Sequence, residues 1–336
     1  MHRARIERHL NDIWYGRQPV PATLDWLSTL HGWWARRRTQ PPVSTGSIPV
    51  IVVGNLVAGG AGKTPVVRAL GDALRQAGHR VVVVARGYGA RSRHARPRWV
   101  DEHTLPSAVG DEPCMLAQMA GLEVVVCADR ARAVAAAIDA GADVVISDDG
   151  LQNQGLARSY SVCVVDGTRG FGNERLLPAG PLRQPLSRLS DFDRVVVKGG
   201  EFVPDVAHTR FELRPEALTQ LATGERVAMD AWLGRSVRAV CGIAHPAGFQ
   251  ATLEALGMVV RLVALPDHHR YRPSDLTGLP TDGPIVVTEK DAVKIRALAL
   301  PKTTLERVFV LSVTAALESC VLSSVLAHVQ RIKHHD

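Results

Sequence analysis

The segment from Val53 to Pro65, Val-Gly-Asn-Leu-Val-Ala-Gly-Gly-Ala-Gly-Lys-Thr-Pro, restricts the fold of this chain more than any other. The apolar run 48–53 predicts a buried strand, and the residues after Thr64 predict a helix. A glycine-rich loop between a strand and a helix that ends in Gly-Lys-Thr is typical of a P-loop, whose backbone N–H groups surround phosphate oxygens. The alternative is a glycine-rich turn with an accidental Gly-Lys-Thr. The flanking strand and helix favour nucleotide binding.

Each part of this loop has a predicted role in binding ATP. Lys63 supplies a positive charge to the β- and γ-phosphates, and the Thr64 hydroxyl is a ligand for Mg²⁺. The strict pattern has glycine at position 57, where this chain has Val57. The residues predicted to form the nucleotide site are Val57, Ala58, Gly59, Gly60, Ala61, Gly62, Lys63 and Thr64.

Apolar, β-branched runs alternate with helical patterns from residue 48 onward, which predicts a P-loop NTPase-like, mostly parallel sheet with helices on both faces. The expected strands are 48–54, 80–85, 123–127, 143–147, 161–165 and 193–198, and the expected helices are 65–77, 111–120 and 130–140. Ligands of such a sheet bind beyond the carboxyl ends of its strands.

The length of 336 residues favours two domains. A second alternating block predicts a smaller α/β domain, with strands at 237–241, 258–263, 284–288 and 307–311 and helices at 246–255 and 290–299. The less regular region before it is expected to connect the two. The predicted divisions are a basic, Trp-rich segment 1–40, a P-loop nucleotide-binding domain 41–200, a connecting region 201–235 and a smaller C-terminal α/β domain 236–336.

The positive charge of the chain is concentrated at its amino end. Of the formal net charge of +7, residues 1–40 contribute +4, from seven arginines and three acidic residues. The same segment holds Trp14, Trp26, Trp33 and Trp34. No apolar run reaches the ~20 residues of a membrane span, and the sequence shows no basic-then-apolar signal peptide with a small-residue cleavage site. A cytoplasmic protein is expected.

Residues 22–38 predict an amphipathic helix with Leu24, Leu27, Leu30 and Trp34 on one stripe and Arg36, Arg37 and Arg38 at its end. One interpretation is a helix docked on the core through this stripe. The other is an interfacial helix, because tryptophan lies at the level of lipid headgroups and arginine pairs with anionic lipid.

The five cysteines are scattered and contain no Cys-x-x-Cys pair, which favours buried thiols in a reducing compartment over disulfides or a metal site. They are Cys114, Cys127, Cys163, Cys241 and Cys320.

Asp148 and Asp149 end an apolar strand. In P-loop enzymes an acidic residue at such a strand end holds magnesium, directly or through water. The alternative is a helix cap and a turn, since Asp-Gly is common in turns. The P-loop upstream favours a metal role for both residues.

Two further segments contain candidate acid–base groups. Asp111, in Gly-Asp-Glu-Pro, is either the cap of a helix or a base that accepts a proton near the phosphates. Asp267, His268 and His269 form either a solvated loop or the partner of Asp111, because histidine orients a carboxylate base well near neutral pH. The residues alone leave both choices open.

Three other motifs have weaker interpretations. Arg86-Gly87-Tyr88-Gly89 either brings Arg86 near phosphates or is a plain loop, and the apolar segment 176–183 is a candidate pocket lining for an apolar or sugar substrate. The segment 288–294, Thr-Glu-Lys-Asp-Ala-Val-Lys, is interpreted as a helix cap followed by a solvated charged face.

As an ordered series, these motifs resemble those of the tetraacyldisaccharide 4′-kinases, the lipid A 4′-kinases of Gram-negative bacteria. The resemblance covers roughly residues 10 to 310. The matching motifs are 53–65, 86–89, Gly110-Asp111-Glu112-Pro113, Asp148-Asp149-Gly150-Leu151-Gln152, 177–183, Asp267-His268 and 288–292.

The resemblance implies transfer of the ATP γ-phosphate, with Mg²⁺, to the 4′-hydroxyl of an acylated glucosamine disaccharide 1-phosphate. It also implies peripheral attachment to the cytoplasmic face of the inner membrane, with no nucleic acid and no obligate protein partner. By this analogy Asp111 is the base, paired with His268, while Lys63 holds the phosphates. Thr64, Asp148 and Asp149 hold the metal. Relatives often carry glutamate where this chain has Gln184, which leaves no carboxylate at that position.

Two other functions fit a P-loop of this kind. One is an ATPase that acts as a nucleotide-driven switch or partner-loading factor, which needs neither a base nor a lipid-facing helix. The other is a kinase for a soluble small molecule, which would not depend on residues 1–40. The Trp- and Arg-rich start and the Asp111 and His268 motifs favour the lipid kinase.

Overall fold

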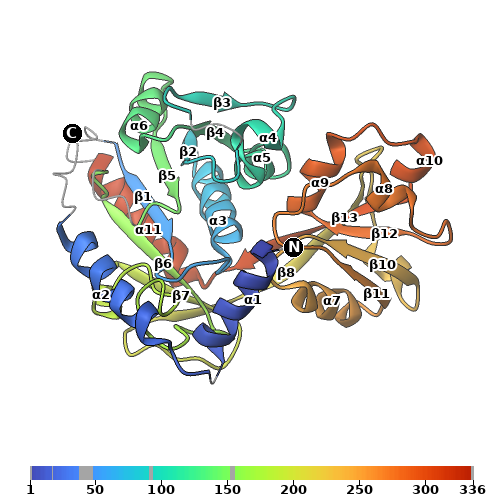
Figure 1. The fold of residues 1–336 in the computed structure, drawn as a ribbon. Coiled ribbons are helices and arrows are strands. Elements are labelled where there is room, and N and C mark those ends of the chain that lie inside the picture. Colours follow the sequence, from blue (N-terminus) through green and yellow to red (C-terminus); the bar gives the residue numbers. More distant parts are fainter. Residues whose placement is uncertain (1, 17, 38–47, 91–93, 152–155, 334–336) are drawn as a thin grey trace.

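The computed structural model describes residues 2–16, 18–37, 48–90, 94–151 and 156–333. Its centre is one mixed, mostly parallel sheet with the strand order β11-β10-β12-β13-β8-β7-β6-β1-β5-β2-β4-β3, to which β9 adds by pairing with β8 (Figure 1). The predicted fold class is confirmed.

The expected strands and helices of the P-loop unit are present within about two residues of their predicted ends. The strands are β1 Val50–Gly54, β2 Val81–Ala85, β3 Arg98–Val100, β4 Glu123–Val126, β5 Val144–Asp148, β6 Tyr160–Asp166 and β7 Arg194–Lys198. The helices are α3 Lys63–Gln76, α4 Pro106–Val109, α5 Asp111–Gln118 and α6 Arg130–Asp139, with a 3₁₀ turn η1 at Leu186–Asp191.

Both faces of β1 are buried, which is why this strand is apolar throughout. Ile51 and Val53 lie in the same hydrophobic cluster as residues of α3, whereas Val50 and Val52 lie in the cluster that contains residues of α6. Successive side chains of a strand point to opposite faces, so an unbroken apolar run is what a sheet covered on both sides requires.

The position of β1 determines where the site forms. β1 pairs in parallel with β5 on one side and with β6 on the other, and Val53 lies opposite Asp148. The P-loop therefore leaves β1 at the same sheet edge at which the acidic pair leaves β5.

The connecting region differs from the expectation. It contains β8, Thr209–Gln220, a 12-residue strand that pairs in parallel with β7 and antiparallel with β13. β8 thus joins the two parts of the sheet, and β9 Arg226–Val227 and the 3₁₀ turn η2 Met229–Trp232 follow it. The exposed, charged positions of β8 hide its strand character in the sequence.

The smaller unit lies on the right in Figure 1 and is built on β10 Ser236–Cys241, β11 Val259–Ala264, β12 Ile285–Thr288 and β13 Val308–Ala316. Its helices are α7 Pro246–Ala255, α8 Pro273–Thr277, α9 Glu289–Arg296 and α10 Lys302–Leu305. The final helix, α11 Ser319–Lys333, does not stay with this unit. Val321, Val325 and Val329 lie in the hydrophobic cluster of α3, so the chain returns to the P-loop unit.

Two helices at the amino end, α1 His2–Tyr15 and α2 Ala22–Arg37, attach to the segment around residues 173–178. The Trp14 indole Nε1 donates to the Pro178 carbonyl at 3.0 Å, and the Ser28 hydroxyl donates to the Leu176 carbonyl at 2.9 Å. Ser28 is buried and Leu24 is half-buried, whereas Leu27 and Leu30 are exposed. Helix α2 therefore docks through the side that carries Ser28, and only part of the predicted leucine stripe is covered. The side chains of Trp33, Trp34, Arg36, Arg37 and Arg38 lie outside the described part of the chain.

No helix among the described residues is both long and apolar enough to cross a membrane. All five cysteines are free thiols; Cys320 is exposed and the other four are buried, which agrees with the sequence-based expectation for four of the five.

Candidate active site at the carboxyl edge of the sheet

The loop between β1 and α3 has the backbone conformation that its glycines allow. Gly59 and Gly62 have φ values of 104° and 88°, in the left-handed region that residues with a Cβ rarely adopt. Helix α3 begins at Lys63, directly after Gly62, so its free N–H groups and Thr64 face the end of the loop. This arrangement is an anion site of the P-loop type.

Val57, the departure from the strict motif, has a packing role. Its side chain is buried, and Val57 forms a β-bridge with Leu182. The next residue, Ala58, donates its N–H to the Pro181 carbonyl at 2.7 Å. The apolar segment 176–183 thus braces the first half of the P-loop. Ala179, Gly180, Pro181 and Leu182 are all buried, so the middle of the segment packs against the protein. A pocket lining formed by this segment stays a prediction.

Lys63 is held by two oxygen-bearing side chains at this edge. Its Nζ lies 3.2 Å from Asn55 Oδ1 and 3.4 Å from Asp149 Oδ1. Asn55 is fully buried and donates from Nδ2 to the Gly59 carbonyl at 3.3 Å. The ammonium group that the motif aims at phosphate is therefore next to the predicted metal ligands.

The paired aspartates have different environments. Burial and then the nearby Glu112 carboxylate raise the pKa of Asp148 well above its usual range. Burial would also raise the pKa of Asp149, but the Lys63 and Arg183 cations hold it below its ordinary value, with Arg183 Nη1 at 3.0 Å from Asp149 Oδ2. Asp149 has a φ of 50°, so it forms the turn and also faces Lys63.

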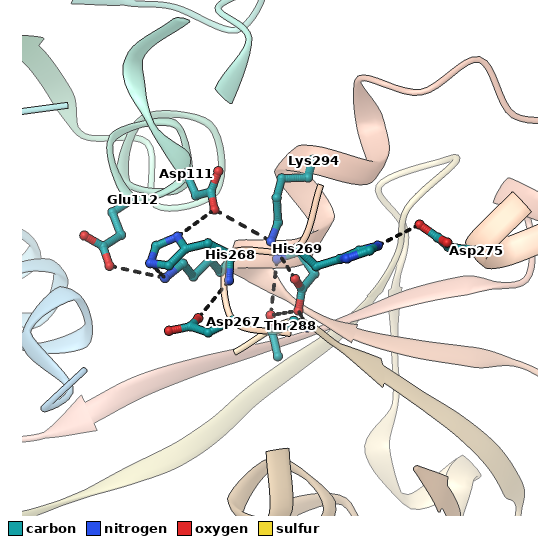
Figure 2. A network of polar contacts seen from close by, with 11 residues as sticks. Asp111, Glu112, Asp267, His268, His269, Asp275, Thr288 and Lys294 are labelled. Atoms are coloured by element: carbon teal, nitrogen blue, oxygen red, sulfur yellow. Dashed lines mark hydrogen bonds and ion pairs between the residues drawn. The ribbon is translucent and has the colours of Figure 1, made fainter. Parts of the chain in front are cut away.

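Asp111 and His268 come together across the two units (Figure 2). Asp111 starts α5 in the P-loop unit, His268 follows β11 in the smaller unit, and His268 Nδ1 lies 3.3 Å from Asp111 Oδ2. His268 has a φ of 57°, an unfavourable conformation for a residue with a side chain. Such strained residues are concentrated at functional sites.

The electrostatic environment keeps Asp111 ionised. Burial alone would raise the pKa of Asp111, but the hydrogen bond with His268 and the cations of Lys294 and Lys290 lower it below its usual value. A carboxylate that stays charged although it is largely buried can accept a proton.

His269 does not share the role of its neighbour. Its Nε2 lies 2.9 Å from Asp275 Oδ2, on the side away from Asp111 in Figure 2. His269 lines a cavity of about 550 Å³ with Arg270, Tyr271, Arg272 and Asp275.

The helix cap predicted in the segment 288–294 is confirmed, since the Thr288 hydroxyl oxygen accepts a hydrogen bond from the Asp291 N–H at 3.2 Å. The solvated charged face predicted after it was wrong. Glu289, Asp291 and Lys294 are buried. Lys294 Nζ lies 3.7 Å from Asp111 Oδ2, and Lys290 Nζ lies 3.4 Å both from Glu112 Oε1 and from His268 Nε2. From the sequence alone, charged residues on a short helix are expected to be exposed. Their burial depends on the packing of α9 against α5, which the sequence does not show.

Three other residues near the site carry no clear sequence signal. The Lys198 side chain lies against the P-loop at Gly62, and its Nζ pairs with Asp166 Oδ2 at 2.8 Å. The Tyr88 ring contacts the His268 ring edge-on, with centroids 5.8 Å apart. A position of Arg86 near the phosphates stays a prediction. Arg130 is buried and donates to the Asp148 carbonyl at 2.8 Å.

The donor set of this edge fits a hard divalent cation. One carboxylate oxygen of Asp148, Oδ1, is buried and has no hydrogen-bond partner among the described residues. No group of three or more His, Cys, Asp or Glu side chains in the described part of the chain is arranged to hold a metal alone. Mg²⁺ commonly binds through one or two carboxylates together with substrate phosphates, so two adjacent aspartates beside a P-loop are sufficient.

A P-loop, an acidic pair at the next strand end and a carboxylate–histidine pair facing them define a P-loop phosphotransferase. The family model described as "Tetraacyldisaccharide-1-P 4′-kinase" matches residues 18–330. The chain belongs to this family, as the motif resemblance indicated. It is an ATP-dependent tetraacyldisaccharide 4′-kinase of lipid A biosynthesis.

Individual relatives agree with this assignment. The chain is 46% identical to the tetraacyldisaccharide 4′-kinase of Alkalilimnicola ehrlichii over 79% of its length and 77% of the relative's. It is 39% identical to that of Xylella fastidiosa over 86% of its own length and 88% of the relative's. The crystal structure of LpxK from Aquifex aeolicus in complex with ATP matches with a TM-score of 0.72 and 26% identity, covering 99% of both chains. The ATPase-switch interpretation is therefore not favoured.

Proposed function

We propose that Asp111 is the general base of the phosphoryl transfer and that His268 orients it. The single observation that carries this proposal is the 3.3 Å contact between Asp111 Oδ2 and His268 Nδ1, made between the two units beside the P-loop. The imidazole fixes the orientation of the carboxylate and keeps the carboxylate ionised.

In this mechanism Asp111 removes the proton of the 4′-hydroxyl as the sugar oxygen attacks the γ-phosphorus of ATP. The new oxygen–phosphorus bond forms while the bond from the γ-phosphorus to the β–γ bridging oxygen breaks, so ADP leaves and Asp111 keeps the proton. Lys63 and the backbone N–H groups of residues 59–64 stabilise the charge on the transferring phosphoryl group, whereas the Ala58 N–H is already bonded to the Pro181 carbonyl. The protein contributes little covalent chemistry, because the positioning of the reactants and the stabilisation of charge dominate catalysis of this reaction.

We propose that Thr64, Asp148 and Asp149 hold Mg²⁺. The unpartnered Asp148 Oδ1 and the raised pKa of that carboxyl support this role, because a cation would satisfy both the oxygen and its charge. When bound, Mg²⁺ would neutralise charge on the β- and γ-phosphates.

We also infer that the protein attaches peripherally to the cytoplasmic face of the inner membrane of a Gram-negative bacterium. α2 is fixed to the P-loop unit by Ser28, while Trp26, Leu27 and Leu30 are 64%, 44% and 44% exposed. An apolar helix face beside arginine-rich sequence is suited to an anionic bilayer. The acylated glucosamine disaccharide 1-phosphate would be bound from that surface, without nucleic acid or an obligate protein partner.

We further propose that the P-loop unit and the smaller unit act as two domains, with the acceptor bound where Asp111 meets His268. The contribution of one residue of the pair by each unit supports this division.

The test is an assay with γ-labelled ATP and monophosphorylated acyl-disaccharide in mixed micelles. The proposal is supported if the unaltered protein labels the lipid and the variants Asp111→Asn and His268→Ala do not. ATP turnover without labelled lipid would contradict it, and full activity of Asp111→Asn would remove Asp111 from the base role.

A further inference from the structure

Lys294 is a charged side chain in an enclosed position. It lies on α9, its side chain is only 8% exposed, and its Nζ stands 2.9 Å from Asp291 Oδ1 and 3.7 Å from Asp111 Oδ2 (Figure 2). Burial of an unpaired ammonium group is unfavourable in free energy. The position of Lys294 Nζ therefore depends on both carboxylates.

Asp291 is anchored more firmly than the lysine that it holds. It is fully buried, and its Oδ2 accepts hydrogen bonds from the Gly242 N–H at 3.1 Å and from the Thr288 hydroxyl at 2.7 Å. The Tyr271 ring lies under the ammonium, with its centroid 5.2 Å from Lys294 Nζ. The lysine is thus fixed on one side by the smaller unit and faces Asp111 on the other.

We propose that Lys294 is a positioning residue of the phosphoryl transfer, which keeps the Asp111 carboxylate ionised and aimed, and that Asp291 holds Lys294 in place for this purpose. The inference rests on the proposed role of Asp111 as base. Lys294 contacts neither the reacting hydroxyl nor the phosphate in this proposal; it acts through Asp111.

Among the groups around Asp111, the geometry selects Lys294 for this role. The titratable and charged groups that face Asp111 are Glu112 and Cys114 from α5, His268 from the loop after β11, and Lys290 and Lys294 from α9. Lys290 is within 4 Å of Glu112 and of His268, whereas Lys294 is within 4 Å of Asp111 itself. At 3.7 Å Lys294 attracts the carboxylate, and the lone pairs that must accept the substrate proton stay available.

Removal of this cation raises the pKa of the base. An opposite charge within about 4–6 Å lowers a carboxyl pKa by roughly 1–3 units, and burial acts in the other direction. Since the ionised carboxylate is the active form, activity falls as the pH drops through the pKa of Asp111. Loss of Lys294 therefore moves the acidic limb of the rate profile upward.

The experiment measures kcat and kcat/KM for the acyl-disaccharide between pH 4 and pH 9 in the unaltered protein and in Lys294→Met. The range starts near the ordinary pKa of a carboxyl group because the pKa of Asp111 lies below that value in the unaltered protein, so an upward shift brings the acidic limb into the measured range. We expect kcat at pH 7 to fall roughly 10- to 100-fold, as for a misplaced catalytic group. KM for ATP should change less than about 3-fold, because Lys294 acts through Asp111 and does not contact the nucleotide in this proposal. The acidic limb should move up by about 1–2 pH units. Lys294→Arg should restore the shape of the profile, since it restores the charge.

Two further variants make the result decisive. Arg296→Met removes an exposed cation from the same helix and should leave the profile unchanged. The double variant Lys294→Met/Asp291→Asn removes both charges of the buried pair, so it avoids an uncompensated carboxylate, and it should show the same upward shift. A uniform loss of rate with an unmoved acidic limb in both Lys294 variants would overturn the inference. An active Asp111→Asn would instead overturn the base assignment on which it rests.

Discussion

The side chain of Lys63 links the nucleotide-binding loop to the acidic pair. It lies within 3.4 Å of both Asn55 Oδ1 and Asp149 Oδ1, at the point where the P-loop motif places the β- and γ-phosphates. A residue in this position stabilises charge that develops during transfer, so its effect belongs mainly to the transition state.

Lys63→Ala is predicted to lower kcat/KM by at least about 100-fold, because it removes a preorganised positive charge from the transferring phosphoryl group. Steady-state kinetics with saturating acyl-disaccharide provides the measurement. Lys302→Ala, an 88% exposed lysine on α10, is the matched control and should behave as the unaltered protein. Near-normal turnover of Lys63→Ala would rule out the P-loop assignment.

Among single residues, the sequence predicted those that form a motif with their neighbours in the chain. Gly62, Lys63 and Thr64 are adjacent in the chain, and Asp148 and Asp149 end an apolar run, so their edge of the sheet could be inferred. The meeting of Asp111 with His268 stayed one of two alternatives, because 157 residues separate them. Lys290 and Lys294 were missed, since burial of charge on a short helix depends on what packs against it.

Among the elements, helix α2 has two faces that differ strongly in solvent exposure. Ser28 is 7% exposed and hydrogen-bonded, whereas Trp26 on the other face is 64% exposed. A single exposed apolar residue needs no explanation, but three within five positions of one helix do.

The triple variant Trp26→Ser/Leu27→Ser/Leu30→Ser is predicted to weaken binding to anionic vesicles by roughly 10-fold or more, because it removes apolar area that would enter the headgroup region. Vesicle sedimentation measures this, with activity on detergent-dispersed substrate kept as a check of folding. Val203→Ser, at a 62% exposed position outside α1 and α2, serves as control. Unchanged sedimentation of the triple variant would refute the membrane role of α2.

Most elements were predictable because each is encoded within its own segment. The interior strands from β1 to β7 are mostly apolar, and α7 spans Pro246–Ala255, as its pattern predicted. The strand β8 was not recognised, because five of its twelve positions are exposed and it contains Pro215. The return of α11 to α3 has no local signal at all.

For the molecule as a whole, a partly buried ion-pair network centred on Arg68 joins the two units. Arg68 on α3 bonds Glu289 at the start of α9 at 2.9 Å and Glu216 on β8 at 2.7 Å. The side chains of Arg68 and Glu289 are only 12% and 7% exposed. The helix that follows the P-loop is thereby tied to the helix that carries Lys290 and Lys294.

Arg68→Met is predicted to reduce the free energy of unfolding by about 3 kcal/mol near pH 8, because it leaves Glu289 buried without its partner. Burial already raises the pKa of Glu289, and Arg68 counteracts this, so the variant raises it further. An acid with a raised folded-state pKa binds more protons folded than unfolded, so stability falls as pH rises through that window. The deficit should therefore shrink at pH 5.

Denaturant unfolding at both pH values measures this deficit. The double variant Arg68→Met/Glu289→Gln should recover most of the loss, since no buried charge is left unpaired. If the loss of unfolding free energy is the same at pH 5 and pH 8, ionised Glu289 is not its cause.

The most direct measurement of the central claim compares catalysis with nucleotide affinity in Asp111→Asn. If Asp111 is the base that His268 holds opposite the P-loop, kcat falls by about 100- to 10,000-fold while the dissociation constant for ATP, measured by calorimetry, stays within about 3-fold. A variant with near-normal kcat, or one whose only defect is weak ATP binding, would contradict it.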